Sequence, residues 1–261
     1  MDSDKIKIIA FDADDTLWVS EPLFREAERL WADLLKDYGT LEALSAALYA
    51  VEVANMEDYG YGAKAFTLSL LETSVKVTDG ALTAEQTARI LAIGRRLLHN
   101  PAQPMPGVRR TLEALHGSGR YRMVLLTKGD LLDQEHKVER SGLAPFFDRI
   151  CVVSDKNERT YRSLLEEFGE GPEAFAMVGN SFKSDIKPVL ELGGWGIYVP
   201  FHITWELEKT EEFDHHRLAR AERFEDILPI LLPPADGAVS CGTACPDVQG
   251  SRQGTKKKNN P

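Results

Sequence analysis

Short apolar runs alternate with polar turns and helical patterns along this chain, and that alternation constrains its fold more than any other feature. Such runs, rich in Ile, Val, Leu and aromatic residues, are typical of buried strands. Strands that alternate with helices form a parallel sheet through right-handed crossovers. We therefore expect an α/β fold, a Rossmann-like parallel sheet of about five strands at residues 6–11, 121–126, 149–153, 175–178 and 196–199.

Apolar residues at helical spacing separate the later strands. Val108, Leu112 and Leu115 mark one helix face, and a less regular stripe runs through Leu131, Leu132 and Val138. Two further stripes lie within residues 161–168 and 186–192. Each stripe predicts a helix between two strands.

The block between the first two strands, residues 18–104, contains several helical stripes and no strand pattern. Pro22 and Gly39 bracket the first stripe, and Thr83 with Gln86 forms a capping box at the start of the last one. A block of this kind is too long for an ordinary crossover. It predicts an inserted helical cap, with the core formed by residues 1–17 and 105–232 and a disordered, Gly/Pro/Ser-rich tail at 233–261.

Bulk properties exclude several classes of partner. The net charge of −10 argues against nucleic-acid binding, and no apolar run reaches the length of a membrane span. The start of the chain has no signal-peptide pattern, so we expect a cytoplasmic protein without a membrane partner. The three cysteines form no disulfide framework, and the six histidines show no metal spacing. The oligomeric state is not encoded in these features.

The first strand ends abruptly in carboxylates. Asp12 and Asp14 follow it, with Thr16 just beyond. Ligands of open α/β sheets bind at the carboxyl ends of the strands, and clustered carboxylates repel unless a cation or a reaction uses them. An Asp-rich turn would also explain the segment alone, but three later segments favour a functional site.

The second strand leads into Thr127, Lys128 and Gly129, and the third leads into Lys156. A hydroxyl and backbone N–H groups in a strand-to-helix turn suit an anionic oxygen. A lysine just past the same edge would neutralise a phosphate or crowded carboxylates. Taken singly, each set also fits ordinary turn chemistry.

The fourth strand leads into Asn180, Ser181 and Asp185. Oxygen ligands from separate loops, including carboxylates, suit Mg²⁺. Ser184 as a helix cap is the alternative explanation of this turn. All four polar sets follow strands, so a parallel sheet would place them on one edge.

In their order, these four sets resemble the motifs of the haloacid dehalogenase superfamily, over residues 6 to about 200. Asp12, Asp14 and Thr16 match its first motif, Thr127 its second, and Lys156 its third. Asn180 and Asp185 match its fourth. The helical block resembles the superfamily's first cap class, which lies between motifs one and two.

The resemblance implies a Mg²⁺-dependent phosphatase that acts on small phosphorylated metabolites. Asp12 would attack phosphorus and form an aspartyl-phosphate, while Asp14 would act first as general acid and then as general base. Thr127 and Lys156 would complete the catalytic set. The implied metal ligands are Asp12, Asp14 through its carbonyl, Asn180 and Asp185. The implied substrate contacts are Thr16, Trp18, Thr127, Lys128 and Gly129.

The chain departs from the superfamily's motifs at two positions, and several alternative functions remain open. The fourth motif commonly has Asp where this chain has Asn180, and Lys156 lacks the common following proline, which leaves Lys128 as the alternative lysine. A 2-haloacid dehalogenase usually lacks the acid at Asp14, since it protonates no alkoxide. A phosphosugar mutase retains it. A non-catalytic metabolite-binding relative is the alternative that Asn180 encourages.

The substrate itself is not encoded in the motifs. We expect specificity to lie in the helical block and in the loop after Asp14, at Trp18, Glu21 and Tyr59 or Tyr61. Trp18 would either stack on a base or sugar ring or pack against the cap. We also expect the block to open and close over the site, because it must admit substrate and then exclude water.

Overall fold

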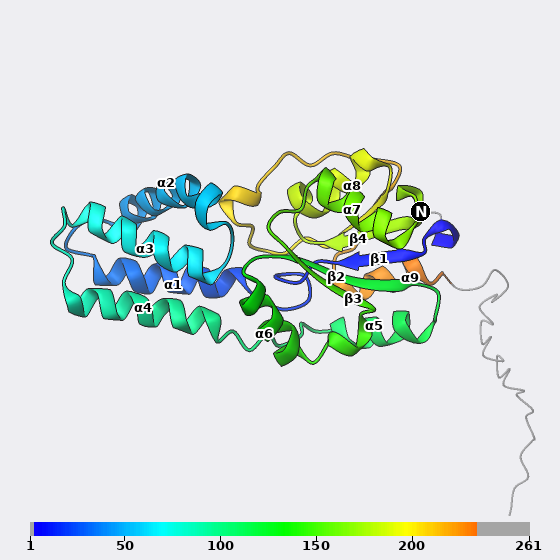
Figure 1. The fold of residues 1–261 in the computed structure, drawn as a ribbon, viewed down its shortest axis with the longest axis horizontal. Coiled ribbons are helices and arrows are strands. Elements are labelled where there is room, and N and C mark those ends of the chain that lie inside the picture. The colour runs from blue at the N-terminus through cyan, green and yellow to red at the C-terminus, as the bar shows by residue number, and fades with distance from the viewer. Residues whose placement is uncertain (1–2, 234–261) are drawn as a thin grey trace, which may run out of the picture.

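The computed structural model describes residues 3–233, whose strands form one parallel sheet in the order β3-β2-β1-β4-β5-β6 (Figure 1). All neighbouring strands pair in parallel. The α/β prediction is confirmed, with six strands instead of about five. They are β1 (Ile8–Phe11), β2 (Arg122–Lys128), β3 (Arg149–Val153), β4 (Phe175–Gly179), β5 (Trp195–Tyr198) and β6 (Leu218–Arg220).

Strand β1 lies in the middle of this sheet and sets the position of the site. It pairs with β2 on one side and β4 on the other, so that Phe11 lies opposite both Leu125 and Val178. The chain continues from β1 to β2 on one side and from β4 to β5 on the other, so the carboxyl ends of the neighbours β1 and β4 form a topological switch point, where open α/β sheets bind their ligands. Asp12 directly follows β1, and its backbone N–H donates to the Val178 carbonyl at 2.9 Å.

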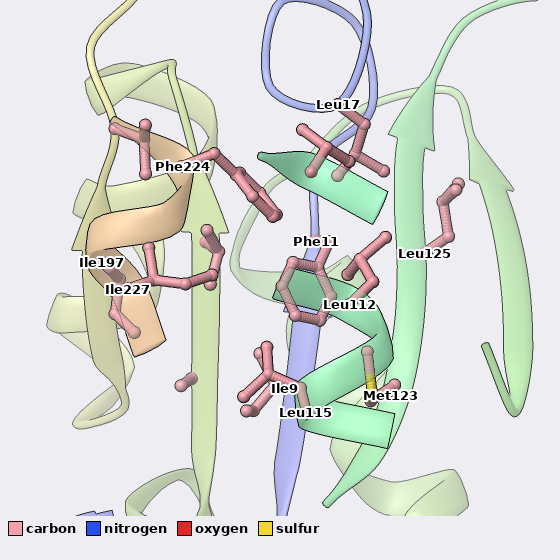
Figure 2. Close-up of a cluster of buried hydrophobic side chains, with 14 of the residues drawn as sticks. Ile9, Phe11, Leu17, Leu112, Leu115, Met123, Leu125, Ile197, Phe224 and Ile227 are labelled. Atoms are coloured by element: carbon pink, nitrogen blue, oxygen red, sulfur yellow. The ribbon is translucent and has the colours of Figure 1, made fainter. Parts of the chain in front are cut away.

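Alternate residues of β1 anchor helices on the two faces of the sheet. Ile9 and Phe11 belong to one hydrophobic cluster, with helices α5 (Val108–Gly117), α6 (Leu131–Ser141) and α9 (Leu228–Leu231) (Figure 2). Ile8 and Ala10 belong to the cluster on the opposite face, under α7 (Glu158–Phe168) and α8 (Lys187–Leu192) (Figure 1). All four side chains are fully buried, so β1 is held rigidly from both sides.

Residues between β1 and α5 form a bundle of four helices: α1 (Glu21–Leu34), α2 (Leu41–Tyr59), α3 (Ala63–Val77) and α4 (Ala84–Leu98). The bundle has its own hydrophobic cluster, with Trp31 and Leu70 fully buried, and the Trp31 indole donates to Ser74 Oγ at 2.8 Å. The capping box of Thr83 and Gln86 is present. The bundle extends from the end of the sheet toward which β1 runs (Figure 1).

The two segments that connect the bundle to the sheet lie side by side. Trp18 forms an antiparallel bridge with Pro104, and the Met105 N–H donates to the Leu17 carbonyl at 2.9 Å. The chain therefore leaves and re-enters the sheet domain at one point. The predicted disordered tail lies outside the described residues from position 234 onward.

No helix within residues 3–233 combines the length and the apolar composition that a membrane span requires. β6 escaped prediction because its three residues, Leu218–Arg220, lie in a polar stretch without an apolar run. It pairs with β5 alone, at the edge of the sheet.

Candidate active site

Lys156 lies at the centre of the candidate site, between two carboxylates. Its Nζ donates to Asp12 Oδ1 at 2.5 Å and to Asp185 Oδ1 at 2.7 Å. Lys156 is 3% exposed and Asp185 is 1% exposed. Three of the four sequence motifs therefore meet at one nitrogen atom, since these residues follow β1, β3 and β4.

The three charges depend on one another. Burial alone would lower the pKa of Lys156, but the carboxylates of Asp12 and Asp185 outweigh burial and raise that pKa. Lys156 is therefore an ammonium ion at neutral pH. Burial raises the pKa of Asp185 to about 7, and Lys156 opposes that rise. The ammonium group is thus the local positive charge that allows two carboxylates to lie together.

Thr16 joins the first motif to the fourth. Its hydroxyl donates to Asp12 Oδ2 at 2.8 Å and lies 3.1 Å from Asn180 Oδ1, while the Asn180 backbone N–H donates to Thr16 Oγ1 at 3.1 Å. Thr16 is fully buried and is absent from the cavity wall. It therefore positions Asp12 from outside the cavity lining, and its predicted contact with substrate stays a prediction.

Gly179 makes room for Asp185. A Cβ atom at this position would lie 2.2 Å from Asp185 Oδ2, so only glycine allows the carboxylate to fold back against the end of β4. In this position Asp185 Oδ2 accepts a hydrogen bond of 3.0 Å from the Ser181 backbone N–H. The fourth motif is therefore a close-packed turn whose shape depends on Gly179.

The oxygen atoms at this point fit a hard divalent cation. Asp12, Asn180 and Asp185 all line the cavity, so carboxylate and amide oxygens are available there. Carboxylate and amide oxygens are the donors that Mg²⁺ prefers. Within residues 3–233, no group of three His, Cys, Asp or Glu side chains has the arrangement of a metal site. A metal here would therefore need the Asn180 amide or a backbone carbonyl as well as carboxylates.

The carboxylate of Asp14 is held by donors on both oxygens. Trp18 Nε1 donates to Oδ1 at 2.8 Å, Gln134 Nε2 donates to Oδ2 at 2.9 Å, and Lys137 Nζ lies 3.2 and 3.0 Å from the two oxygens. Burial alone would raise the pKa of Asp14, but Lys137 and these hydrogen bonds lower it. The lowered pKa favours the ionised form of Asp14 in this arrangement, so Asp14 must take up a proton before it can act as an acid.

A cavity of about 430 Å³ connects the end of the sheet to the helical bundle. Asp12, Asp14, Thr127, Lys128 and Lys156 line it on the sheet side. Helices α1 to α3 supply the opposite wall, including Glu21, Arg25, Tyr49, Glu52, Asn55 and Phe66. A cavity of this size encloses a small organic ligand against both carboxylates.

Not every predicted substrate contact reaches this cavity. Trp18 is fully buried, binds Asp14 and does not line the cavity, so its predicted contact with substrate stays a prediction and its placement favours packing. Gly129 and Tyr59 do not line the cavity either, whereas Glu21 and Tyr61 do. A Cβ at Gly129 would lie 2.9 Å from Gln134 Nε2, so this glycine admits the Gln134 side chain.

Glu208 is a component of the site that sequence reasoning missed. It accepts hydrogen bonds of 2.5 Å from Lys128 Nζ, Ser181 Oγ and Ser184 Oγ, and Lys128 also lies 4.1 Å from the centre of the Tyr61 ring. Lys128 is thus already paired with a carboxylate. That pairing favours Lys156, not Lys128, as the lysine that serves Asp12.

Helix α6 carries two more residues that the sequence did not reveal. Leu131 and Leu132, which belong to the apolar stripe predicted for this helix, are 60% and 52% exposed. Gln134 and Lys137 are buried in their place, with Asp133. Because Gln134 and Lys137 are polar, the sequence did not indicate that this side of the helix is buried. Their spacing with Val138 is nevertheless that of residues on one side of a helix.

Comparison with known proteins agrees with this geometry. The family model described as haloacid dehalogenase-like hydrolase matches residues 6–193, which include all four motifs. The chain belongs to this family. The haloacid dehalogenase-like hydrolases are enzymes, and the superfamily predicted from the motifs is confirmed.

Individual members of the family resemble the chain over most of its length. A crystal structure of a haloacid dehalogenase-like family hydrolase from Xanthomonas campestris has 40% sequence identity and a TM-score of 0.77, covering 87% of this chain and 92% of that one. Glyceraldehyde 3-phosphate phosphatase from Methanothermobacter thermautotrophicus is 27% identical over 210 residues, which are 76% of this chain and 88% of that protein. Pyrimidine 5'-nucleotidase from Escherichia coli strain K12 is 25% identical over 197 residues, covering 68% and 79%.

Proposed function

We propose that this hydrolase removes the phosphoryl group from small phosphate monoesters through an aspartyl-phosphate on Asp12. The observation that carries the proposal is the meeting of Asp12, Lys156 and Asp185 beside a cavity that Asp14 also lines. The similarity to glyceraldehyde 3-phosphate phosphatase and to pyrimidine 5'-nucleotidase supports the same class of substrate.

Asp12 is the nucleophile in this proposal because β1 fixes it and Lys156 attracts the phosphate toward it. An Asp12 carboxylate oxygen forms a bond to phosphorus, and the bond between phosphorus and the ester oxygen breaks. Asp14, in its protonated form, donates a proton to the departing oxygen. Water then attacks phosphorus, Asp14 accepts its proton, and the bond to Asp12 breaks to release inorganic phosphate.

Positive charge is the main requirement of this reaction, since a phosphate dianion must approach a carboxylate. Lys156 supplies one charge, and Thr127 also lines the cavity. Asp12, Asn180, Asp185 and the Asp14 carbonyl would hold Mg²⁺. When bound, the ion would add the charge that offsets repulsion between the phosphate and the carboxylates.

Asp14 distinguishes this proposal from halide displacement. A dehalogenase breaks a carbon–halogen bond and has no alkoxide to protonate, so it needs no acid at this place. Here Asp14 lines the cavity and is held by three side chains. We also propose that the α1–α4 bundle is a cap over the cavity, with residues 18–20 and 100–105 as the connection about which it opens.

The decisive experiment measures hydrolysis of p-nitrophenyl phosphate and of an alkyl phosphate panel, with Mg²⁺ and with EDTA. We expect turnover that depends on Mg²⁺ and falls at least about 10³-fold in Asp12→Asn. Asp33→Asn, an exposed aspartate on α1, is the control and should keep full activity. Inactivity of the wild type toward all phosphate esters, or release of halide from a 2-haloacid without metal, would refute the proposal.

A further inference from the structure

We propose that Lys137 and Gln134 of α6 are positioning residues, which fix the direction in which the Asp14 carboxylate faces the cavity. The inference rests on the proposed function, because it concerns the residue assigned there as acid and base. Neither α6 side chain belongs to the four sequence motifs. Both are among the residues that line the cavity.

The contacts at Asp14 leave its carboxylate a single orientation. Lys137 Nζ lies 3.0 Å from Oδ2 and 3.2 Å from Oδ1, and Gln134 Nε2 donates to Oδ2 at 2.9 Å. Trp18 approaches Oδ1 from a third direction at 2.8 Å. The terminal torsion of an aspartate is otherwise broad, so these donors set how the carboxylate faces the ester oxygen.

Lys137 is more than a packing residue. It is 3% exposed, and its ammonium group is steadied by a second carboxylate, Asp133, at 3.4 Å. An apolar side chain of similar volume would often stabilise a buried position as well or better. Stability alone therefore does not account for a lysine on the cavity wall that forms an ion pair with Asp14.

Gln134 is itself held in place. Its Nε2 also donates to the Lys128 carbonyl at 2.7 Å, so the amide links the end of β2 to Asp14. Gly129 has a φ of +136° and leaves the space that this amide occupies. The loop after β2 therefore serves Asp14 through Gln134, which gives Gly129 a role other than contact with substrate.

Correct orientation of Asp14 matters to different steps for different leaving groups. An alkyl phosphate needs a proton from Asp14 when the ester bond breaks, whereas a nitrophenolate leaves without one. Both substrates need Asp14 as base when water attacks the aspartyl-phosphate. Misorientation should therefore slow the first step for alkyl esters only, and the second step for both.

The test compares Lys137→Met and Gln134→Met with wild type on an alkyl phosphate and on p-nitrophenyl phosphate, by steady-state and rapid-mixing kinetics. For each variant we expect kcat on the alkyl ester to fall about 10²-fold with little change in KM. With p-nitrophenyl phosphate, a burst of nitrophenolate should precede a slow steady state. Lys137→Arg should restore part of the lost turnover, because it keeps a cation beside Asp14.

Arg140→Met is the matched control, since it removes an exposed cation from the same helix. Thermal melts check that each variant folds. If loss of Lys137 leaves Asp133 unpaired and unfolds the chain, Gln134→Met still tests whether α6 positions Asp14. Equal losses for both esters without a burst, or an effect on KM alone, would overturn the inference while the proposed function stands. A wild type inactive on every phosphate ester would overturn both.

Discussion

Removal of Lys156 should lower the folding stability of the protein, because two buried carboxylates lose the cation between them. In Lys156→Met, the carboxylates of Asp12 and Asp185 lose the ammonium group that lies within 2.7 Å of both. Breaking a buried ion pair by removing one partner costs about 3–5 kcal/mol. For a chain of this size each kcal/mol lowers the melting temperature by about 2–4 °C, so we expect a fall of about 6–20 °C in EDTA.

A second substitution tests the reason for that fall. Adding Asp12→Asn to Lys156→Met removes one of the two repelling carboxylates, so it should raise the melting temperature. The same Asp12→Asn change in wild type removes a partner of Lys156 and should lower it. Mg²⁺ should stabilise Lys156→Met more than the double variant, because the ion would replace the missing charge between two carboxylates.

Circular dichroism melts and urea unfolding give the melting temperature and the free energy of unfolding of wild type, the two single variants and the double variant, with EDTA and with Mg²⁺. We predict an interaction free energy between positions 12 and 156 of at least about 1 kcal/mol. Two results together would refute the claim that Lys156 stabilises this pair of carboxylates: Lys156→Met loses less than about 1 kcal/mol of stability, and Asp12→Asn has the same effect in wild type as in Lys156→Met.

Three other outcomes are expected. Gly179→Ala would place a Cβ 2.2 Å from Asp185 Oδ2, and the displaced carboxylate should lower kcat about 10²-fold in a phosphatase assay, with an intact far-ultraviolet spectrum. Burial and the nearby carboxylates of Glu28 and Glu21 raise the pKa of Glu52 from 4.5 to about 7. The folded protein therefore loses stability as the pH rises through this interval, because Glu52 must ionise while buried. Glu52→Gln should raise the melting temperature at pH 8 but not at pH 4.5. Leu70→Ala, in the core of the α1–α4 bundle, should cost about 2–5 kcal/mol in urea unfolding.

The fold was largely predictable because its strands and helix ends carry local signals. The run before Asp12 is uniformly apolar, and Thr83 with Gln86 satisfies backbone groups that lie three residues apart. Such signals depend on neighbours in sequence. β6 lacks them, because Leu218–Arg220 becomes a strand only by pairing with the edge of β5.

The predicted side chains that meet at the site were those that follow strands. A parallel sheet brings the ends of its strands to one edge, so Asp12, Lys156 and Asp185 could be expected to meet. Lys137 and Glu208 could not, since a buried polar residue is recognisable only from its partner across the fold. Trp18 is a related case: the sequence left open whether it stacks on a ligand or packs against the cap, and only the fold shows it buried with its indole bonded to Asp14.

The central claim is that Asp12 carries the phosphoryl group during the reaction. Acid quenching of the wild-type enzyme within milliseconds of mixing with p-nitrophenyl phosphate and Mg²⁺, followed by peptide mass spectrometry, tests it directly. We predict one added phosphoryl group on the peptide that contains Asp12, lost on longer incubation and absent from Asp12→Asn. Phosphate release at full rate by Asp12→Asn, or a phosphoryl group on any other residue, would contradict the account.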